Sequence, residues 1–281
     1  MNILVFGKNG QIARELNSLV SAKFLSREEC NFLNPSNCAD VVAHANADIV
    51  INLAAYTNVD GAEDDKELAN IINGEAPVAI AIACARKGIP LIHLSTDYVY
   101  GDDGDLPIVL TTKTNPLNAY GRSKLMGDIG IINSEVDYII LRTSWVFSKY
   151  GGNFLKTILR LSQSNQVLKI VNDQVGGPTP ALEIAKACLC IAEKFYLDRS
   201  LSGIYHFAGH PNVSWAKFAE KIVSFNKNKI KINLIKTAEF KSKAMRQKNS
   251  RLDCTNLKIK FGIDQPNWQV NVKSIIEEIK P

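Results

Sequence analysis

The stretch ILVFGKNGQIA, residues 3–13, decides the fold. Its first four residues are apolar and typical of a buried strand, and helical apolar spacing begins at Gln11. Gly7 and Gly10 stand between the two patterns, and glycine lets a backbone approach a phosphate closely. The amino end of the following helix would present unpaired N–H groups to a diphosphate. A strand, a glycine turn and a helix in this order predict a dinucleotide site rather than a plain connecting turn.

The same alternation continues through the first half of the chain. Apolar runs typical of strands occupy residues 48–53, 90–94 and 138–141. Between them, residues 77–86 and 116–132 have helical periodicity. This order predicts an α/β fold with a Rossmann-like, doubly wound parallel sheet. Ligands of such sheets bind beyond the carboxyl ends of the strands.

The pattern loosens after about residue 150, which predicts two domains. Glycine and proline interrupt the chain near residues 151 and 176–180, and a strong helix covers 181–195. We assign residues 1–149, together with a helix at about 180–200, to a Rossmann domain that binds NADP. Residues of about 150–179 and 201–281 are expected to form a smaller, interleaved substrate domain.

Composition excludes several classes of protein. The chain has 281 residues, of which 46% are hydrophobic and 22% charged, as in ordinary globular proteins. It lacks both a run of about 18 apolar residues and a signal-peptide layout, so we expect no membrane partner. Its six cysteines lie far apart without the spacing of a zinc site. We therefore predict reduced thiols, no metal site and a cytoplasmic location.

Positive charge is concentrated near the carboxyl end. Residues 221–260 contain 12 Lys and Arg but only 2 Asp and Glu. Such a segment suits nucleic acid, but it lacks interleaved aromatic residues and a groove-reading motif, so we expect no nucleic-acid partner. Two interpretations remain, a solvated lysine surface and a pocket wall that attracts an anionic substrate.

Tyr120 and Lys124 form a candidate acid–base pair. Residues four apart lie on one face of a helix, and an ammonium favours the phenolate form of a nearby tyrosine. Together they can exchange a proton with a substrate oxygen. Thr96 follows the strand at 90–94 and can hydrogen-bond the same oxygen. His93, inside that strand, is interpreted as a core residue.

The second strand indicates which coenzyme is used. An Asp or Glu about 20 residues after the glycine turn would bind the ribose of NAD. Here Ser26 and Arg27 occupy that place, and a hydroxyl and a guanidinium suit a 2′-phosphate better. Glu28 and Glu29 follow directly. We expect NADP(H) to be preferred, with NAD(H) possible.

The motifs taken together resemble one known family. They are GKNGQIA (7–13), INLAAYTNVDGAE (51–63), LSTDYVYGDDGD (94–105), NPLNAYGRSK (115–124), LRTSWVF (141–147), GGNFLKTILRL (151–161) and NDQVGGPTPA (172–181). The set resembles the extended short-chain dehydrogenase/reductases and, within them, most closely the dTDP-4-dehydrorhamnose reductases. The resemblance covers essentially the whole chain.

The resemblance implies roles for particular residues. The implied catalytic residues are Thr96, Tyr120 and Lys124. The implied cofactor-binding residues, beyond the catalytic ones, are Gly7, Gly10, Gln11, Ile12, Ser26, Arg27, Asn31, Phe32, Ala54, Ala55, Tyr56 and Leu94. The implied substrate-binding residues are Thr57, Val59, Thr96, Asp97, Trp145, Asn249 and Arg251.

The resemblance also implies a reaction, the reduction by NAD(P)H of the C4 keto group of a dTDP-4-dehydro-6-deoxy sugar. The alternatives are another nucleotide-sugar 4-ketoreductase, an epimerase, or a non-catalytic dinucleotide-binding regulatory subunit. Tyr98 stands where a dehydratase has a glutamate, and Gln247 stands where the family usually has a proline. Some relatives bind Mg²⁺ at a dimer interface, and Glu15 matches one such position; Mg²⁺ and a homodimer therefore stay open.

Overall fold

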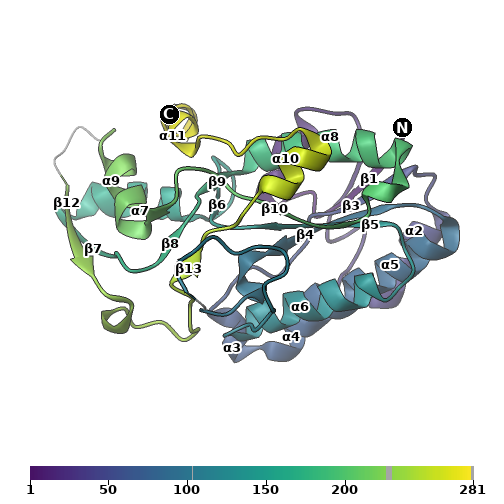
Figure 1. Cartoon of the computed structure of the whole chain (residues 1–281), viewed down its shortest axis with the longest axis horizontal. Helices are drawn as coiled ribbons and strands as arrows, with labels where there is room; N and C mark the ends of the chain where they lie inside the picture. The colour runs from purple at the N-terminus through teal and green to yellow at the C-terminus, as the bar shows by residue number, and fades with distance from the viewer. Residues whose placement is uncertain (103, 226–229, 280–281) are drawn as a thin grey trace.

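A six-stranded parallel sheet forms the centre of the protein (Figure 1). The computed structural model describes residues 1–102, 104–225 and 230–279. The strands lie in the order β2-β1-β3-β4-β5-β10, and each neighbouring pair is parallel. Their bounds are β1 Ile3–Phe6, β2 Lys23–Leu25, β3 Ile49–Asn52, β4 Leu91–Thr96, β5 Tyr138–Thr143 and β10 Gly203–Phe207.

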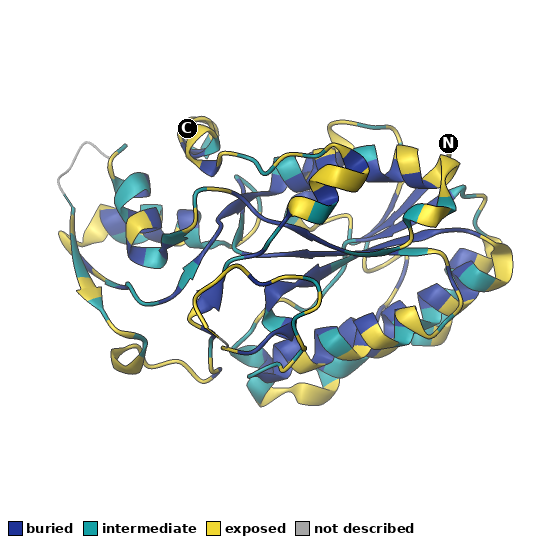
Figure 2. Cartoon of the chain, viewed as in Figure 1, coloured by how far each residue is buried: buried dark blue, intermediate teal, exposed yellow. Residues whose placement is uncertain are grey.

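Helices cover both faces of this sheet, because alternate strand residues point to opposite sides. Val5 and Ile51 pack on one side with the helices above the sheet in Figure 1, and Leu4 and Val50 pack on the other. The upper helices are α1 Gln11–Asn17, α8 Ala181–Leu197 and α10 Thr255–Phe261. The lower helices are α2 Pro35–His44, α3 Gly61–Asp64, α4 Lys66–Asn70, α5 Ala76–Lys87 and α6 Ala119–Ile132. The predicted doubly wound α/β fold is confirmed. Figure 2 shows buried residues along the strands and exposed ones on the outer faces of the helices.

One continuous helix is long and apolar on average, although the sequence has no uninterrupted run of about 18 apolar residues. Helix α4, the π-helical turn η1 (Ile71–Glu75) and α5 together span Lys66–Lys87. Among the described residues this is the one helix long and apolar enough to cross a membrane. Its most apolar window of 18 residues has a mean hydropathy of 1.5. However, 56% of that window is buried inside the protein, as in the core helix of a globular domain.

A second, smaller body packs beside the carboxyl edge of the sheet (Figure 1). Its core contains Phe147, Leu155, Phe218 and Trp268, separate from the two cores of the sheet. Its helices are α7 Phe154–Ser164, α9 Trp215–Val223 and α11 Trp268–Ile279. Its strands are β6 Val146–Phe147, β7 Val167–Val171, β8 Val175–Gly176, β9 Thr179–Pro180, β11 Val213–Ser214, β12 Lys231–Ile235 and β13 Asn249–Ser250. The remaining single turns are η2 Asp97–Val99, η3 Arg199–Leu201 and η4 Thr237–Glu239.

One predicted boundary needs correction. The sequence assigned residues 201–281 to the substrate domain, but β10 pairs with β5 as the sixth strand of the central sheet. The chain thus stays with the sheet after α8 through residue 207. The short apolar run around Tyr205 did not indicate that it pairs with β5, because the local spacing of apolar residues carries no information about which distant strand is the neighbour. The division into two domains otherwise remains a prediction.

Candidate active site

A cavity of about 900 Å³ opens at the carboxyl ends of β1, β3, β4 and β5. Residues of the glycine turn form one end of it, and Trp145, Phe154 and Trp215 form the other. The sheet places the cavity here because its strand order reverses beside β1, which is where ligands bind in open α/β sheets.

The glycine turn has the geometry that a dinucleotide site requires. Gly7 has φ of +94°, and a Cβ there would lie 2.8 Å from the backbone nitrogen of Ala54. No residue with a side chain fits this position. Gly10 is the N-cap of α1, and no side chain caps that helix. The first N–H groups of α1 therefore remain available to an anion.

Tyr120 reaches the cavity from the first turn of α6. The helix begins there because the Asn118 side chain accepts a hydrogen bond of 2.8 Å from the Gly121 N–H. A Cβ at Gly121 would lie 2.2 Å from the Tyr98 carbonyl oxygen, so glycine permits this close packing. The Tyr98 and Tyr120 rings meet edge to face, with centroids 5.6 Å apart. Thr96 hydrogen-bonds the Tyr120 side chain.

Lys124 lies one turn further along α6 and is buried. Its Nζ donates a hydrogen bond of 2.7 Å to the Leu94 carbonyl oxygen and lies 3.1 Å from the Nε2 of His93. Burial lowers the pKa of Lys124 to about 8, because a buried site disfavours the charged form.

The pKa of Tyr120 differs in direction from the prediction. Burial raises it above the ordinary value for tyrosine, and the hydrogen bond with Thr96 opposes that effect only in part. The expected lowering by Lys124 does not appear, because burial has the largest effect on the phenol. Tyr120 is therefore a phenol at neutral pH, which is the form that can donate a proton.

The other end of the cavity combines a buried acid with a pair of indoles. Asp97 is buried and receives hydrogen bonds from the Thr96 hydroxyl (3.1 Å) and the Gln247 Nε2 (3.0 Å). Burial raises the pKa of Asp97 to about 6. The Trp145 and Trp215 rings stack 3.5 Å apart. Aromatic faces beside polar groups suit a sugar or a nucleobase.

Comparison with known proteins shows the family to which this chain belongs. Residues 1–280 match the family described as RmlD substrate binding domain. A dTDP-4-dehydrorhamnose reductase of Sinorhizobium fredii is 40% identical over 98% of this chain and 97% of its own. The chain belongs to the RmlD family. The resemblance drawn from the motifs, to the dTDP-4-dehydrorhamnose reductases among the extended short-chain enzymes, is confirmed.

Solved structures agree with this family assignment. The dTDP-4-dehydrorhamnose reductase of Clostridium acetobutylicum superposes with a TM-score of 0.93, at 30% identity and full coverage of both chains. That of Bacillus anthracis, solved in complex with NADP, gives a TM-score of 0.90 at 31% identity, covering 99% of this chain and 100% of its own. The RmlD chain described here is thus an oxidoreductase that uses a nicotinamide dinucleotide.

Most predicted site residues of this RmlD chain line one cavity. Its lining includes the catalytic three and these further predicted residues: Gly7, Gly10, Gln11, Ile12, Ser26, Arg27, Asn31, Phe32, Leu94, Ala54, Ala55, Thr57, Val59, Asp97 and Trp145. Three predicted residues are not among its lining: Tyr56, Asn249 and Arg251. The buried Asn249 amide instead donates to the Leu106 carbonyl, and Arg251 binds the Asn249 oxygen. The roles of all these residues remain predictions.

Sequence reasoning missed several residues of the RmlD cavity. Trp215 stacks on Trp145, yet it stands 70 positions later in the sequence, at the first position of α9. Phe154 and Tyr98 also line the cavity. An aromatic residue at the start of a helix is a weak signal, because the same pattern is typical of an ordinary core contact.

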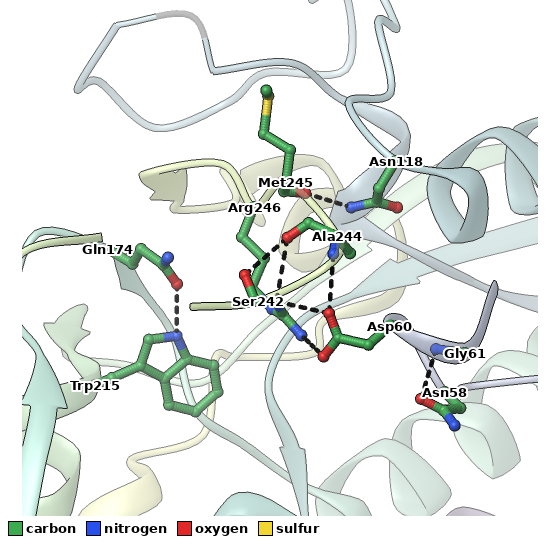
Figure 3. A network of polar contacts seen from close by, with 10 residues as sticks. All are labelled: Asn58, Asp60, Gly61, Asn118, Gln174, Trp215, Ser242, Ala244, Met245 and Arg246. Carbon is green, nitrogen blue, oxygen red and sulfur yellow. Dashed lines mark hydrogen bonds and ion pairs between the residues drawn. The ribbon is translucent and has the colours of Figure 1, made fainter. Parts of the chain in front are cut away.

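The basic segment of this RmlD chain pairs in part with the sheet domain (Figure 3). The Arg246 guanidinium lies 2.7 Å from the Asp60 carboxylate, which also accepts from the Ala244 N–H. The Asn118 amide donates to the Met245 carbonyl, which Figure 3 also shows. Lys243, which that view does not include, pairs with Asp64. These contacts join residues 243–246 to the starts of α3 and α6, and α6 carries Tyr120. We call the three contacts made by Asp60 and Asn118 the latch; the exposed Lys243–Asp64 pair lies outside it.

At the glycine-turn end of the cavity, Ser26 contacts one of the acidic residues that follow it. The Ser26 N–H donates to the Glu29 carboxylate, and Lys8 lies 3.9 Å from the same group. Arg27 is exposed. Glu15, the position matched to a Mg²⁺ ligand, is buried, and burial raises its pKa. Among the described residues, no group of three or more His, Cys, Asp and Glu could hold a metal ion.

Proposed function

We propose that this enzyme uses NADPH to reduce the C4 keto group of a dTDP-4-dehydro-6-deoxy sugar, converting dTDP-4-dehydro-L-rhamnose to dTDP-L-rhamnose. The observation that carries the proposal is the arrangement of Thr96, Tyr120 and Lys124 in one cavity with the glycine turn. Names of relatives at 35–40% identity over nearly their full length support the choice of substrate. The product is a sugar donor for cell-surface polysaccharide.

The residues present fit a nicotinamide dinucleotide. Gly7 and Gly10 keep the turn open, and the uncapped start of α1 offers N–H groups to a diphosphate. When bound, NADPH would supply the hydride that reaches C4. Lys124, with one N–H directed to Leu94, retains further hydrogen-bonding capacity toward the cavity that it lines.

Tyr120 is the proton donor in this proposal. Its raised pKa keeps the phenol protonated at neutral pH, and reduction of a ketone needs a proton on the developing alkoxide. Thr96 would hydrogen-bond the same oxygen and stabilise its charge. Trp145 and Trp215 would contact the sugar or the base, and the Asp97 carboxylate would accept a hydrogen bond from a sugar hydroxyl.

Deuterium transfer tests the proposed reaction directly. NADPH deuterated at the nicotinamide C4 position is incubated with the protein and dTDP-4-dehydro-L-rhamnose, and the product is analysed by NMR. We expect one deuterium at C4 of the product sugar. Deuterium at another carbon of the sugar would overturn the proposed reaction. Consumption of NADPH without formation of a reduced sugar would overturn it as well.

Four further expectations belong to this proposal. We infer that NADP(H) is preferred over NAD(H), since Ser26 and Arg27 lie at the cavity end beside β2. The free state of all six cysteines is compatible with a cytoplasmic enzyme. Binding of Mg²⁺ and a homodimer are predictions of the family resemblance alone.

A further inference from the structure

His93 and Asn52 form a buried polar chain behind Lys124 that the reaction above does not use. Both residues are fully buried, on neighbouring parallel strands β4 and β3, and they pair in register. The Asn52 Nδ2 lies 3.1 Å from His93 Nδ1, and His93 Nε2 lies 3.1 Å from Lys124 Nζ. Each link needs one donor and one acceptor, so the chain constrains where the protons are.

The orientation of Asn52 fixes the first link. The Ala54 backbone N–H, which can only donate, lies 3.1 Å from the Asn52 Oδ1. The amide oxygen must face Ala54, and the amide NH₂ must face His93. His93 Nδ1 therefore accepts, and the single proton of the neutral imidazole sits on Nε2. Burial and the nearby lysine hold the pKa of His93 well below its usual value, so the ring is neutral.

The tautomer of His93 then constrains Lys124. A protonated Nε2 faces the lysine amine, and only a neutral amine has the lone pair to accept from it. An ammonium would instead require the proton on Nδ1, directly opposite the Asn52 NH₂. Turning the Asn52 amide over would move that conflict to the Ala54 N–H. Every arrangement with an ammonium leaves two donors facing each other in the core, whereas the neutral amine pairs every group.

We propose that His93 is a positioning residue: Asn52 holds its imidazole as the Nε2–H tautomer, which donates to the Lys124 amine and favours the neutral lysine in the coenzyme-free protein. Lys124 then changes charge near neutral pH instead of near the usual value for lysine. The low pKa given by burial points the same way. The consequence for activity rests on the proposed function, in which Lys124 serves the reaction.

Other charged groups around Lys124 are few. Asp128, on the same helix, favours the ammonium form, but its carboxylate is bound by Arg142 of β5. Among the described residues, no carboxylate lies within ion-pair distance of Lys124 Nζ. Tyr120 faces the cavity and is a neutral phenol. His93 is therefore the group whose hydrogen bond most directly selects the lysine charge.

The tautomer is measured without reference to catalysis. The chain has four histidines, so ¹⁵N–¹H correlation spectra of histidine-labelled protein are sparse, and a His93→Gln spectrum assigns the residue. We expect the ¹⁵N shifts of His93 to report a protonated Nε2 and an unprotonated Nδ1. Asn52→Asp, which is isosteric and in its ionised form can only accept, is expected to move the proton to Nδ1. A wild-type Nδ1–H tautomer would overturn the inference.

The pH dependence of kcat/KM provides the second measurement. We expect an alkaline limb near pH 8, where Lys124 loses its proton. In Asn52→Asp and in His93→Gln, whose amide oxygen can accept from an ammonium, the limb moves to higher pH by about one unit, a typical spread for pKa values in proteins. His44→Gln, at an exposed histidine, is the control that leaves the limb in place.

The outcomes separate the two proposals. If wild-type protein does not reduce the 4-keto sugar, the proposed function fails, and the NMR tautomer still decides the state of His93. If reduction occurs but neither variant moves the alkaline limb, His93 has only a structural role. If one variant does not fold, the other still provides the pH profile, and the tautomer is read from the wild-type protein.

Discussion

Trp145 and Trp215 stack with their ring centroids 3.5 Å apart and their planes within 10° of parallel. Trp145 follows β5 with φ of +48°, a left-handed conformation that is costly for a bulky residue. Trp215 begins α9 of the second body and donates its indole N–H to the Gln174 oxygen, as Figure 3 shows. The stack therefore joins the sheet to the second body at the wall of the cavity.

Loss of this stack should weaken binding of the nucleotide sugar. In Trp215→Leu we expect KM for the sugar substrate to rise roughly tenfold with kcat changed by less than about twofold, because a stacked aromatic wall contributes about 0.5–1.5 kcal/mol beyond its area. Steady-state kinetics at saturating NADPH measure both parameters. Phe240→Leu, at an exposed aromatic residue, is the control. An unchanged KM would remove the stack from substrate binding.

Asp97 should make folding stability depend on pH. The pKa of this buried carboxyl is raised to about 6 in the folded protein, whereas an unfolded chain has about 3.9. Its contribution to stability is therefore fully present below about pH 4 and is lost as pH rises through 6. Asp97→Asn should remove this slope and be more stable than wild type at pH 7, by on the order of 2 kcal/mol.

Gln247 explains why the substitution is expected to fit. Its Nε2 donates to Asp97, while its buried Oε1 has no hydrogen-bond partner among the described residues. An asparagine at position 97 can keep its amide oxygen toward the Gln247 Nε2 and so preserve that hydrogen bond. Urea unfolding between pH 4.5 and 7.5 measures the effect, and Asp40→Asn at an exposed position is the control. Equal pH slopes in wild type and Asp97→Asn would contradict the assignment.

The latch should affect the sugar substrate and not the coenzyme. Asp60→Asn and Arg246→Gln each break the half-buried ion pair, and we expect a coupling of roughly 1 kcal/mol in kcat/KM for the sugar from a double-mutant cycle. The dissociation constant for NADPH should not change. Asp64→Asn breaks the exposed pair with Lys243 and is the matched control. Equal effects of the exposed and half-buried pairs would argue against a latch.

Arg27 should determine coenzyme preference. Replacing it by aspartate places a carboxylate where the 2′-phosphate is expected, so Arg27→Asp should favour NADH, by about 10-fold or more in the ratio of kcat/KM values. Arg86→Asp, at an exposed residue of α5, controls for the change in net charge. The same ratio before and after the substitution would place the phosphate elsewhere.

Local sequence was sufficient to predict most of the central sheet. The period of apolar residues marks β1 and β3 to β5, and the glycine turn and the spacing of Tyr120 and Lys124 are encoded within a few residues. The candidate catalytic residues could be grouped because parallel strands end at one edge of a sheet.

Contacts between distant segments could not be predicted in this way. Trp215 reaches Trp145, and β10 joins the sheet, only through tertiary packing. The assignment of His93 to the core was correct about its burial but did not identify its neighbour Lys124. The pKa of Tyr120 was predicted in the wrong direction because burial, which outweighs the expected influence of Lys124, is a property of the folded chain.

The central claim is that Tyr120 donates the proton in a ketone reduction at this cavity. It is tested most directly by mixing enzyme, NADPH and dTDP-4-dehydro-L-rhamnose anaerobically and following the loss of nicotinamide absorbance. We predict steady turnover by wild type and by Tyr196→Phe, at an exposed tyrosine. Tyr120→Phe should bind NADPH normally but turn over roughly 10²-fold or more slowly. Turnover by Tyr120→Phe at the wild-type rate would contradict the claim.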